Sequence, residues 1–96
     1  MYDLDKLRNE IDEIDRQMQA LFERRMKISE KVAAFKIGTG KPVFDPVREE
    51  ALLQKLRGRA SDEKEAEAVA ELYRTVLKIS RDRQTSLIEK SSPTGR

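Results

Sequence analysis

One cation interrupts an otherwise apolar helical pattern in the first third of the chain, and a second lies on nearly the same helix face. Arg25 stands between Leu21 and Ile28 in a series of residues that steps alternately by three and four. A guanidinium at such a position extends to water, pairs with a glutamate, or holds an anionic ligand. Lys36 follows Arg25 by 11 residues, which is three helical turns on and nearly the same face. The pair therefore indicates a candidate anion site along one helix.

Polar residues also interrupt the patterns of two later helices. The first group, at the start of a short predicted helix, shares one face by its spacing and consists of Asp45, Arg48 and Glu49. The second group, in the apolar stripe of a third helix, is Ser80 and Gln84. Each group has a structural alternative, since Asp45 can simply cap its helix and the others can face water. Together with the two cations, they predict a pocket for a small polyanion inside a helical bundle.

A third cation, Arg8, lies too far along the first helix to share a small ligand with Arg25 of the same chain. The two residues are 17 positions apart, and this spacing corresponds to about 25 Å at the helical rise. In an antiparallel dimer, however, the start of one long helix lies beside the middle of the other. We therefore predict that Arg8 of a second copy completes the site across the interface.

The stepped series defines a long first helix. We call this series the seam, and its members are Leu4, Leu7, Ile11, Ile14, Met18, Leu21, Arg25, Ile28, Val32 and Phe35. The pattern predicts a helix from about Leu4 to about Ile37, ended by Gly38 and Gly40. Such a helix is about 50 Å long, whereas a compact chain of 96 residues has a radius of gyration of about 12–13 Å. Because one chain cannot cover this seam, we predict an intertwined homodimer.

Two further helices are predicted after a loop that contains glycine and proline. Asp45 precedes a proline, and this N-cap pair predicts a helix over 46–57 that Gly58 closes. Asp62 begins an Asp-x-x-Glu sequence of the capping-box type, which predicts a third helix over 63–90.

These elements predict an all-α fold class. Each chain has three helices with a long first helix, and two chains form an intertwined helical-bundle homodimer. Residues 1–90 form one domain, and residues 91–96 are expected to be a disordered tail or linker.

The composition excludes several classes of function. Charged residues make up 40% of the chain, but 20 basic and 18 acidic residues interleave, which is typical of solvated helix faces and not of a nucleic-acid interface. The absence of Cys and His excludes disulfides, thiolate nucleophiles, histidine bases and Cys-based zinc sites. With no apolar stretch long enough to span a membrane and no signal-peptide core, we predict a cytoplasmic protein.

From about Leu4 to Ile88, the order and spacing of these residues resemble those of the all-helical (AroQ-class) chorismate mutases. The segments that carry the resemblance are Leu7–Asp15, Glu23–Arg25, Lys36, Lys41–Glu49 and Ser80–Gln84. The resemblance implies a dimer with two active sites that converts chorismate to prephenate, a step of the shikimate pathway toward phenylalanine and tyrosine. This unimolecular [3,3] rearrangement needs no nucleophile, proton transfer, metal or cofactor.

The resemblance also implies roles for the cations and the glutamine. Arg25 and Arg8 of the second copy would bind the two carboxylates of chorismate, which is a dicarboxylate. Lys36 would reach a carboxylate and the ether oxygen, and Gln84 would donate to the same ether oxygen. By this reading Arg25, Lys36 and Gln84 are the catalytic residues, because they orient the substrate and meet the charge that develops on the breaking bond.

The remaining residues would surround the substrate. By the same resemblance, Arg48 and Ser80 position it near a carboxylate. Glu49 accepts a hydrogen bond from the ring hydroxyl, and Asp45 lies beside it. Two apolar residues would form the walls around the ring, Val32 and Leu77.

Two alternative functions stay open from the sequence. An isochorismate-pyruvate lyase on the same scaffold would share the arginine clamps, although Asp45 and the surrounding Pro-Val-Phe-Asp-Pro sequence favour the mutase. A non-catalytic helical dimerisation module, such as the excised end of a larger enzyme or a regulatory partner, would share the seam but not the pocket.

Overall fold

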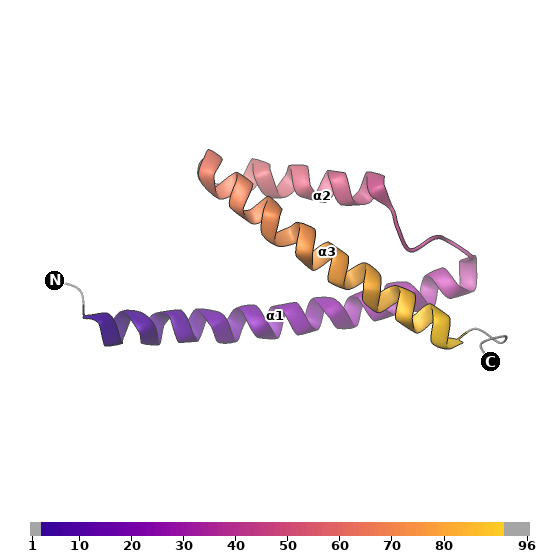
Figure 1. The fold of residues 1–96 in the computed structure, drawn as a ribbon, viewed down its shortest axis with the longest axis horizontal. Coiled ribbons are helices and arrows are strands. Elements are labelled where there is room, and N and C mark those ends of the chain that lie inside the picture. Colours follow the sequence, from indigo (N-terminus) through magenta and orange to yellow (C-terminus); the bar gives the residue numbers. More distant parts are fainter. Residues whose placement is uncertain (1–2, 92–96) are drawn as a thin grey trace.

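The computed structural model describes residues 3–91, and within this range it contains three helices and no strand. They are α1 (Leu4–Thr39), α2 (Pro46–Arg59) and α3 (Glu63–Ser91). Helix α3 packs against both α1 and α2 and so joins them (Figure 1). The predicted all-α class with three helices is therefore confirmed. Of the predicted tail, Ser91 belongs to α3, and residues 92–96 lie outside the described range.

The ends of α1 are set by local hydrogen bonds. Asp3 accepts a hydrogen bond from the backbone N–H of Asp5 at 3.0 Å, which caps the first turn. At the other end Gly40 adopts a left-handed conformation with φ of 72°, and its N–H donates to the carbonyl of Lys36 at 2.8 Å. The helix therefore passes through Gly38, which the sequence predicted as a terminator. A glycine inside a helix costs only about 1 kcal/mol relative to alanine, so it does not end the helix by itself.

The second helix also continues further than predicted. Gly58 lies inside α2, and the last turn closes where the N–H of Ala60 donates to the carbonyl of Arg57 at 3.2 Å. The prediction that Gly58 closes the helix was therefore wrong, again because a helical glycine is tolerated. The start of α3 agrees with the predicted cap, since Asp62 accepts from the N–H of Glu65 at 2.8 Å.

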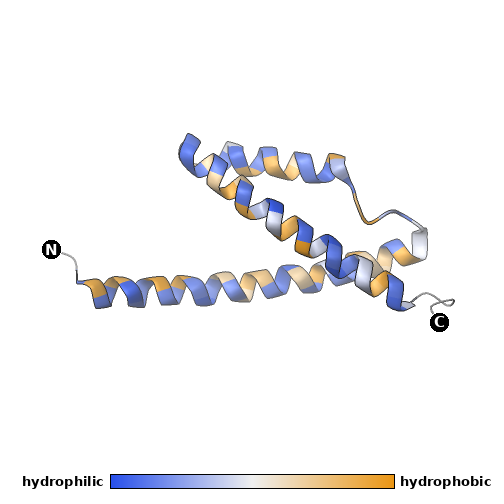
Figure 2. Ribbon diagram, viewed as in Figure 1, coloured by the Kyte–Doolittle hydropathy of each residue, from blue (hydrophilic) through white to orange (hydrophobic). Residues whose placement is uncertain are grey.

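The face of α1 that packs against α3 is not the seam. Its buried residues are Met26, Ser29 and Ala33, and they lie beside the seam on the helix surface. Most seam residues are more than half exposed in the single chain, namely Leu4, Ile11, Ile14, Met18, Leu21, Ile28 and Phe35. Apolar residues accordingly recur along the whole of α1 in Figure 2, including the part that no other helix covers.

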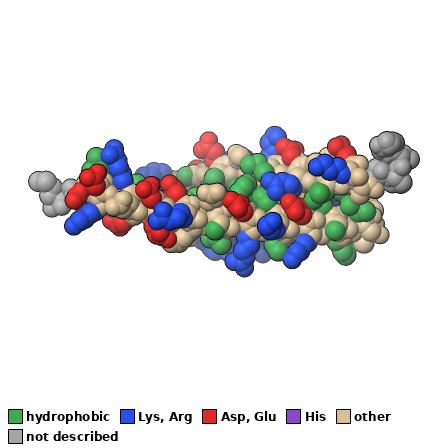
Figure 3. All heavy atoms as spheres, turned by 90° about the horizontal axis from the view of Figure 1, so that it is seen from below, with side chains coloured by type: hydrophobic (Ala, Val, Ile, Leu, Met, Phe, Trp, Pro, Cys, Tyr) green, Lys and Arg blue, Asp and Glu red, His purple; other side chains and the backbone are tan. Residues whose placement is uncertain are grey.

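The molecule is elongated because α1 is much longer than its partners. The principal extents are 63 × 27 × 15 Å and the radius of gyration is 17.4 Å, well above the value of about 12–13 Å expected for a compact chain of this length. The N-terminal half of α1 extends beyond its crossing with α3 (Figure 1). Acidic and basic side chains interleave on the surface in Figure 3. None of the helices in residues 3–91 is long and apolar enough to cross a membrane.

The core that orders the site lies between α2 and α3. Its buried members are Leu53, Ala70 and Leu77, and three partly buried residues pack against them, Leu52, Leu56 and Tyr73. Because Leu77 belongs both to this core and to the cavity described below, packing of α2 on α3 directly sets one wall of that cavity.

Candidate active site

A cavity of about 490 Å³ lies where α1, α3 and the start of α2 meet. This volume is within the range typical of small-molecule sites, about 300–1,000 Å³. Nine of the ten predicted site residues line it, namely Arg25, Val32, Lys36, Asp45, Arg48, Glu49, Leu77, Ser80 and Gln84. The tenth, Arg8, does not. The structure thus brings together residues from three segments of the chain, which are 25–36, 45–49 and 77–84.

Helical spacing explains why each element presents several residues to the cavity. On α1, Arg25, Val32 and Lys36 are separated by seven and four residues, so they lie on one face. On α3, Leu77, Ser80 and Gln84 are separated by three and four, and all three are buried. The residues beside them on the helix, Ile79 and Arg83, are half-buried and exposed, so the polar pair continues the buried stripe.

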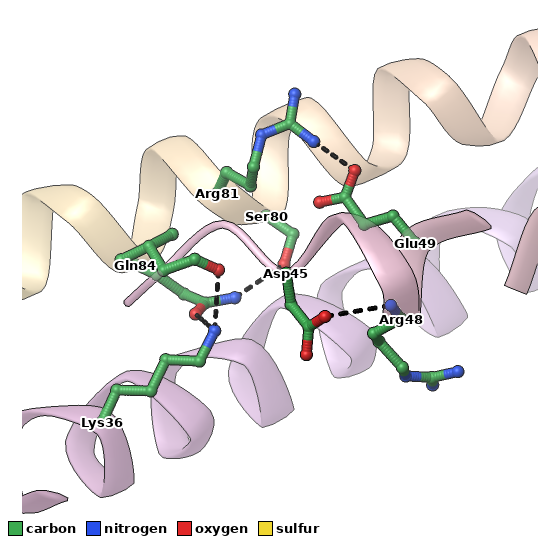
Figure 4. A network of polar contacts seen from close by, with 8 residues as sticks. Lys36, Asp45, Arg48, Glu49, Ser80, Arg81 and Gln84 are labelled. Atoms are coloured by element: carbon green, nitrogen blue, oxygen red, sulfur yellow. Dashed lines mark hydrogen bonds and ion pairs between the residues drawn. The ribbon is translucent and has the colours of Figure 1, made fainter. Parts of the chain in front are cut away.

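Lys36 is the residue that joins these elements. Its Nζ donates to the carbonyl oxygen of Val43 at 2.8 Å and to Oε1 of Gln84 at 3.1 Å (Figure 4). These bonds hold the end of α1 against the connecting loop and against α3. An ammonium group has three hydrogens, so one remains for a ligand while the other two fix the position of the nitrogen.

A buried chain of hydroxyl groups orients the glutamine. Nε2 of Gln84 donates to Oγ of Ser80 at 3.3 Å, and the hydroxyls of Ser80 and Ser29 lie 2.6 Å apart. All three side chains are buried. The amide oxygen therefore faces Lys36 and the amide nitrogen faces Ser80, which leaves the second N–H of Nε2 for another acceptor.

Ser29 was not among the predicted site residues, although it lines the cavity. It stands four residues after Arg25 and seven before Lys36, so it shares their helix face. This spacing was the signal that could have identified it. A serine on a mostly apolar face is unremarkable in a sequence, because its partner Ser80 is 51 residues away.

Arg81 was also missed, and it adds a fourth cation to the cavity lining. Its Nη1 donates to Oε1 of Glu49 at 2.5 Å, and its guanidinium lies 5.1 Å from the centre of the Phe44 ring. Arg81 directly follows Ser80, so its side chain points about 100° around the helix axis from that of Ser80. It reaches the cavity only because α2 lies on that side of α3.

The charge of the lining favours a dianionic ligand. Four cationic side chains (Arg25, Lys36, Arg48 and Arg81) face two carboxylates (Asp45 and Glu49), which leaves two positive charges in excess. Of these four cations, only Arg81 forms an ion pair with a carboxylate within residues 3–91. Arg25 is half-buried, and its guanidinium lies 5.9 Å from the centre of the Tyr73 ring. Arg25 therefore does not pair with a glutamate in the single chain, which was one of the alternatives for its position.

Asp45 has a structural role that the geometry makes explicit. Its Oδ1 accepts from the backbone N–H of Arg48 at 3.0 Å, while Pro46 occupies the first position of α2. The cap fixes where α2 begins and therefore where Arg48 and Glu49 emerge. Asp45 itself remains largely exposed.

Removing this cap should destabilise the protein without unfolding it. Asp45→Ala is expected to lower the free energy of unfolding by about 1 kcal/mol, whereas Asp45→Asn should change it by a few tenths at most, because asparagine caps helices equally well. Urea denaturation monitored by circular dichroism measures both. An equal loss in the two variants would mean that the charge of Asp45, not its cap, stabilises the fold.

The remaining predictions concern Arg8 and a metal site. Arg8 is exposed on the projecting half of α1, so its own chain does not bring it to the site. Within residues 3–91, no group of three or more acidic, histidine or cysteine side chains is arranged to hold a metal ion.

Comparison with known proteins connects this cavity to one family. Residues 7–85 match the family model described as chorismate mutase type II, and this range contains every residue that lines the cavity. The T-protein of Haemophilus influenzae is 36% identical over 75 residues, which is 78% of this chain and 19% of that protein. The chain therefore spans about a fifth of that relative's length.

A solved structure resembles the whole fold. The crystal structure of chorismate mutase from Helicobacter pylori in complex with prephenate superposes with a TM-score of 0.82 at 31% sequence identity. The match covers 93% of this chain and 97% of that one.

Proposed function

The chain belongs to the chorismate mutase type II family, and we propose that its cavity between α1, α2 and α3 converts chorismate to prephenate in aromatic amino acid biosynthesis. The observation that carries the proposal is the cavity lining, which has two positive charges in excess and therefore suits a dicarboxylate. The Helicobacter pylori relative binds prephenate, which is the product of the same reaction. The rearrangement is unimolecular and needs neither a nucleophilic side chain nor a metal ion, so binding and polar contacts from the lining residues are sufficient for it.

Orientation is the first contribution to catalysis. In the rearrangement one C–O bond breaks and one C–C bond forms within the same molecule, so the substrate must be held in a compact conformer. Arg25 on one chain and Arg8 of the second copy clamp the two carboxylates at opposite ends of the substrate. Arginine suits this task because its planar fork binds a carboxylate through two parallel hydrogen bonds. Such positioning lowers the entropic part of the barrier.

Stabilisation of the ether oxygen is the second contribution. Negative charge builds on this oxygen as the C–O bond lengthens. Lys36 and Gln84 lie within 3.1 Å of each other, so a single acceptor can receive a hydrogen bond from both. The bonds to Val43 and Ser80 hold these donors in place before the substrate arrives. Little reorganisation is therefore needed in the transition state.

The remaining lining residues hold the substrate in register. Arg48 and Ser80 lie near one carboxylate, and Glu49 accepts from the ring hydroxyl with Asp45 beside it. Two aliphatic side chains of the lining contact the faces of the ring, Val32 from α1 and Leu77 from α3.

We further propose that the protein is an intertwined homodimer. The seam residues that the single chain leaves more than half exposed run along the whole of α1. Monomeric proteins rarely expose an apolar surface of this extent. Antiparallel pairing of two α1 helices covers the seam and carries Arg8 of each chain toward Arg25 of the other. The molecular mass in solution is therefore expected to be twice the 11.1 kDa of the chain.

Mixed dimers test the shared site directly. Arg8→Met and Arg25→Met should each bind chorismate weakly on their own. When the two variants are refolded together, random pairing makes half of the dimers mixed, and each mixed dimer has one intact site, so about a quarter of wild-type activity should return. Turnover of the mixture against each variant refolded alone is the measurement. If mixing restores nothing, Arg8 does not act across the interface.

The function itself is tested by turnover of purified protein. Loss of chorismate absorbance with prephenate as the identified product supports the mutase. Salicylate plus pyruvate formed from isochorismate would instead support the lyase, and no turnover of either compound would support a dimerisation module. Fractionation of cells that express the chain would test the cytoplasmic location that we propose from the sequence.

A further inference from the structure

Arg81 joins three segments at the cavity and has no part in the mechanism described above. It donates from α3 to Glu49 on α2 (Figure 4) over a distance of 2.5 Å, and its guanidinium lies 5.1 Å from the centre of the Phe44 ring in the loop before α2. The two charged side chains are only 32% and 18% exposed. An ion pair this far removed from water is screened less than a surface pair.

The charge of Glu49 creates a difficulty that Arg81 removes. A carboxylate in the wall of a cavity for a dianion repels that ligand, and repulsion is strong where water is partly excluded. Asp45, the other carboxylate of the lining, is exposed and accepts the capping N–H. Glu49 is the less exposed of the two, and the only cation within 4.0 Å of it in residues 3–91 is Arg81.

We propose that Arg81 is a positioning residue that acts through Glu49. It neutralises the Glu49 carboxylate and holds it through one oxygen, so that the other oxygen can accept from the substrate without a net negative charge facing the dianion. The contact with the Phe44 ring holds the Arg81 guanidinium beside the Glu49 carboxylate. The lining cations Arg25, Lys36 and Arg48 are then left for the substrate. This inference rests on the proposed function, because it takes the ligand to be dianionic.

A double-mutant cycle on chorismate turnover tests the inference. Arg81→Met keeps an unbranched apolar stem but removes the guanidinium that covers the Glu49 charge, so KM should rise about tenfold while kcat changes by less than about threefold. In the Glu49→Gln background the charge is absent, and adding Arg81→Met should change KM by less than about twofold. Arg81→Lys should recover part of the loss, since it restores the charge but not the planar fork.

Arg83→Met is the matched control. Arg83 also lies on α3 and pairs with a glutamate of another helix, Glu30, at 3.3 Å, but neither residue lines this cavity. Its loss should leave KM within about twofold of wild type. Thermal unfolding of each variant separates a loss of fold from a loss of binding.

Two results would overturn the inference. One is a double variant whose KM rises by the product of the two single effects, because Arg81 would then act independently of Glu49. The other is an equal rise in KM for Arg83→Met. Failure of the proposed function is distinguished from both, since it would appear as the absence of chorismate turnover by the wild-type protein.

Discussion

Replacing Lys36 with methionine is expected to lower kcat for chorismate by about 10²–10³, the loss typical of removing one preorganised donor from a developing anion. The side chain keeps its aliphatic stem, so packing along α1 is largely preserved. What is lost is the ammonium that lies between Val43 and Gln84. The amide of Gln84 loses the partner of its oxygen at the same time, so the second donor is also less well oriented.

The measurement is steady-state turnover, with circular dichroism to establish that the variant is folded. Lys31→Met is a matched control, because Lys31 lies on the same helix, is exposed and does not line the cavity. It should keep kcat within about twofold. A Lys36→Met protein that is folded and turns over at the wild-type rate would remove Lys36 from the reaction.

Gln84→Glu is expected to convert an enzyme with a neutral donor into one that works only in acid. At neutral pH the introduced carboxylate has no hydrogen to donate, and it would lie beside Lys36, where Oε1 of the glutamine is now 3.1 Å away. The resulting ion pair withdraws the ammonium from the substrate, and the added negative charge opposes the charge on the ether oxygen. We therefore expect a loss of at least about 10² in kcat at neutral pH.

Acid should reverse this loss. A glutamate has an ordinary pKa of about 4.3, and the adjacent ammonium lowers the pKa of the introduced carboxyl further. The donating, protonated form dominates only below that pKa, so activity must rise as the pH falls and remain highest at about pH 5 or below. A pH profile of kcat for the variant and for wild type measures this.

An exposed glutamine provides the control for the acid shift. Gln54→Glu places the same charge on α2 outside the cavity and should leave the pH profile unchanged. If the Gln84→Glu profile is as flat as that of wild type, Gln84 does not donate to the ether oxygen.

The family and the class of fold could both be predicted from the sequence. The resemblance to the chorismate mutases is confirmed by the family model, which matches residues 7–85. The three helices are confirmed as well, because caps such as Asp45 and Asp62 and the spacing of apolar residues act within a few positions along the chain. Helix ends were less predictable, since both Gly38 and Gly58 proved to be helical.

Which residues share a face was determined by the sequence alone, because helical periodicity is a local property. This is why Arg25 and Lys36 of α1 line the same cavity, as Ser80 and Gln84 of α3 do. Only the tertiary structure decided which face meets which helix. It placed Met26 and Ala33 of α1 against α3 and left the seam open, since two adjacent apolar faces are equivalent in a sequence until a partner is positioned. Contacts between distant positions, such as Ser29 with Ser80, depend on that packing and carry no local signal.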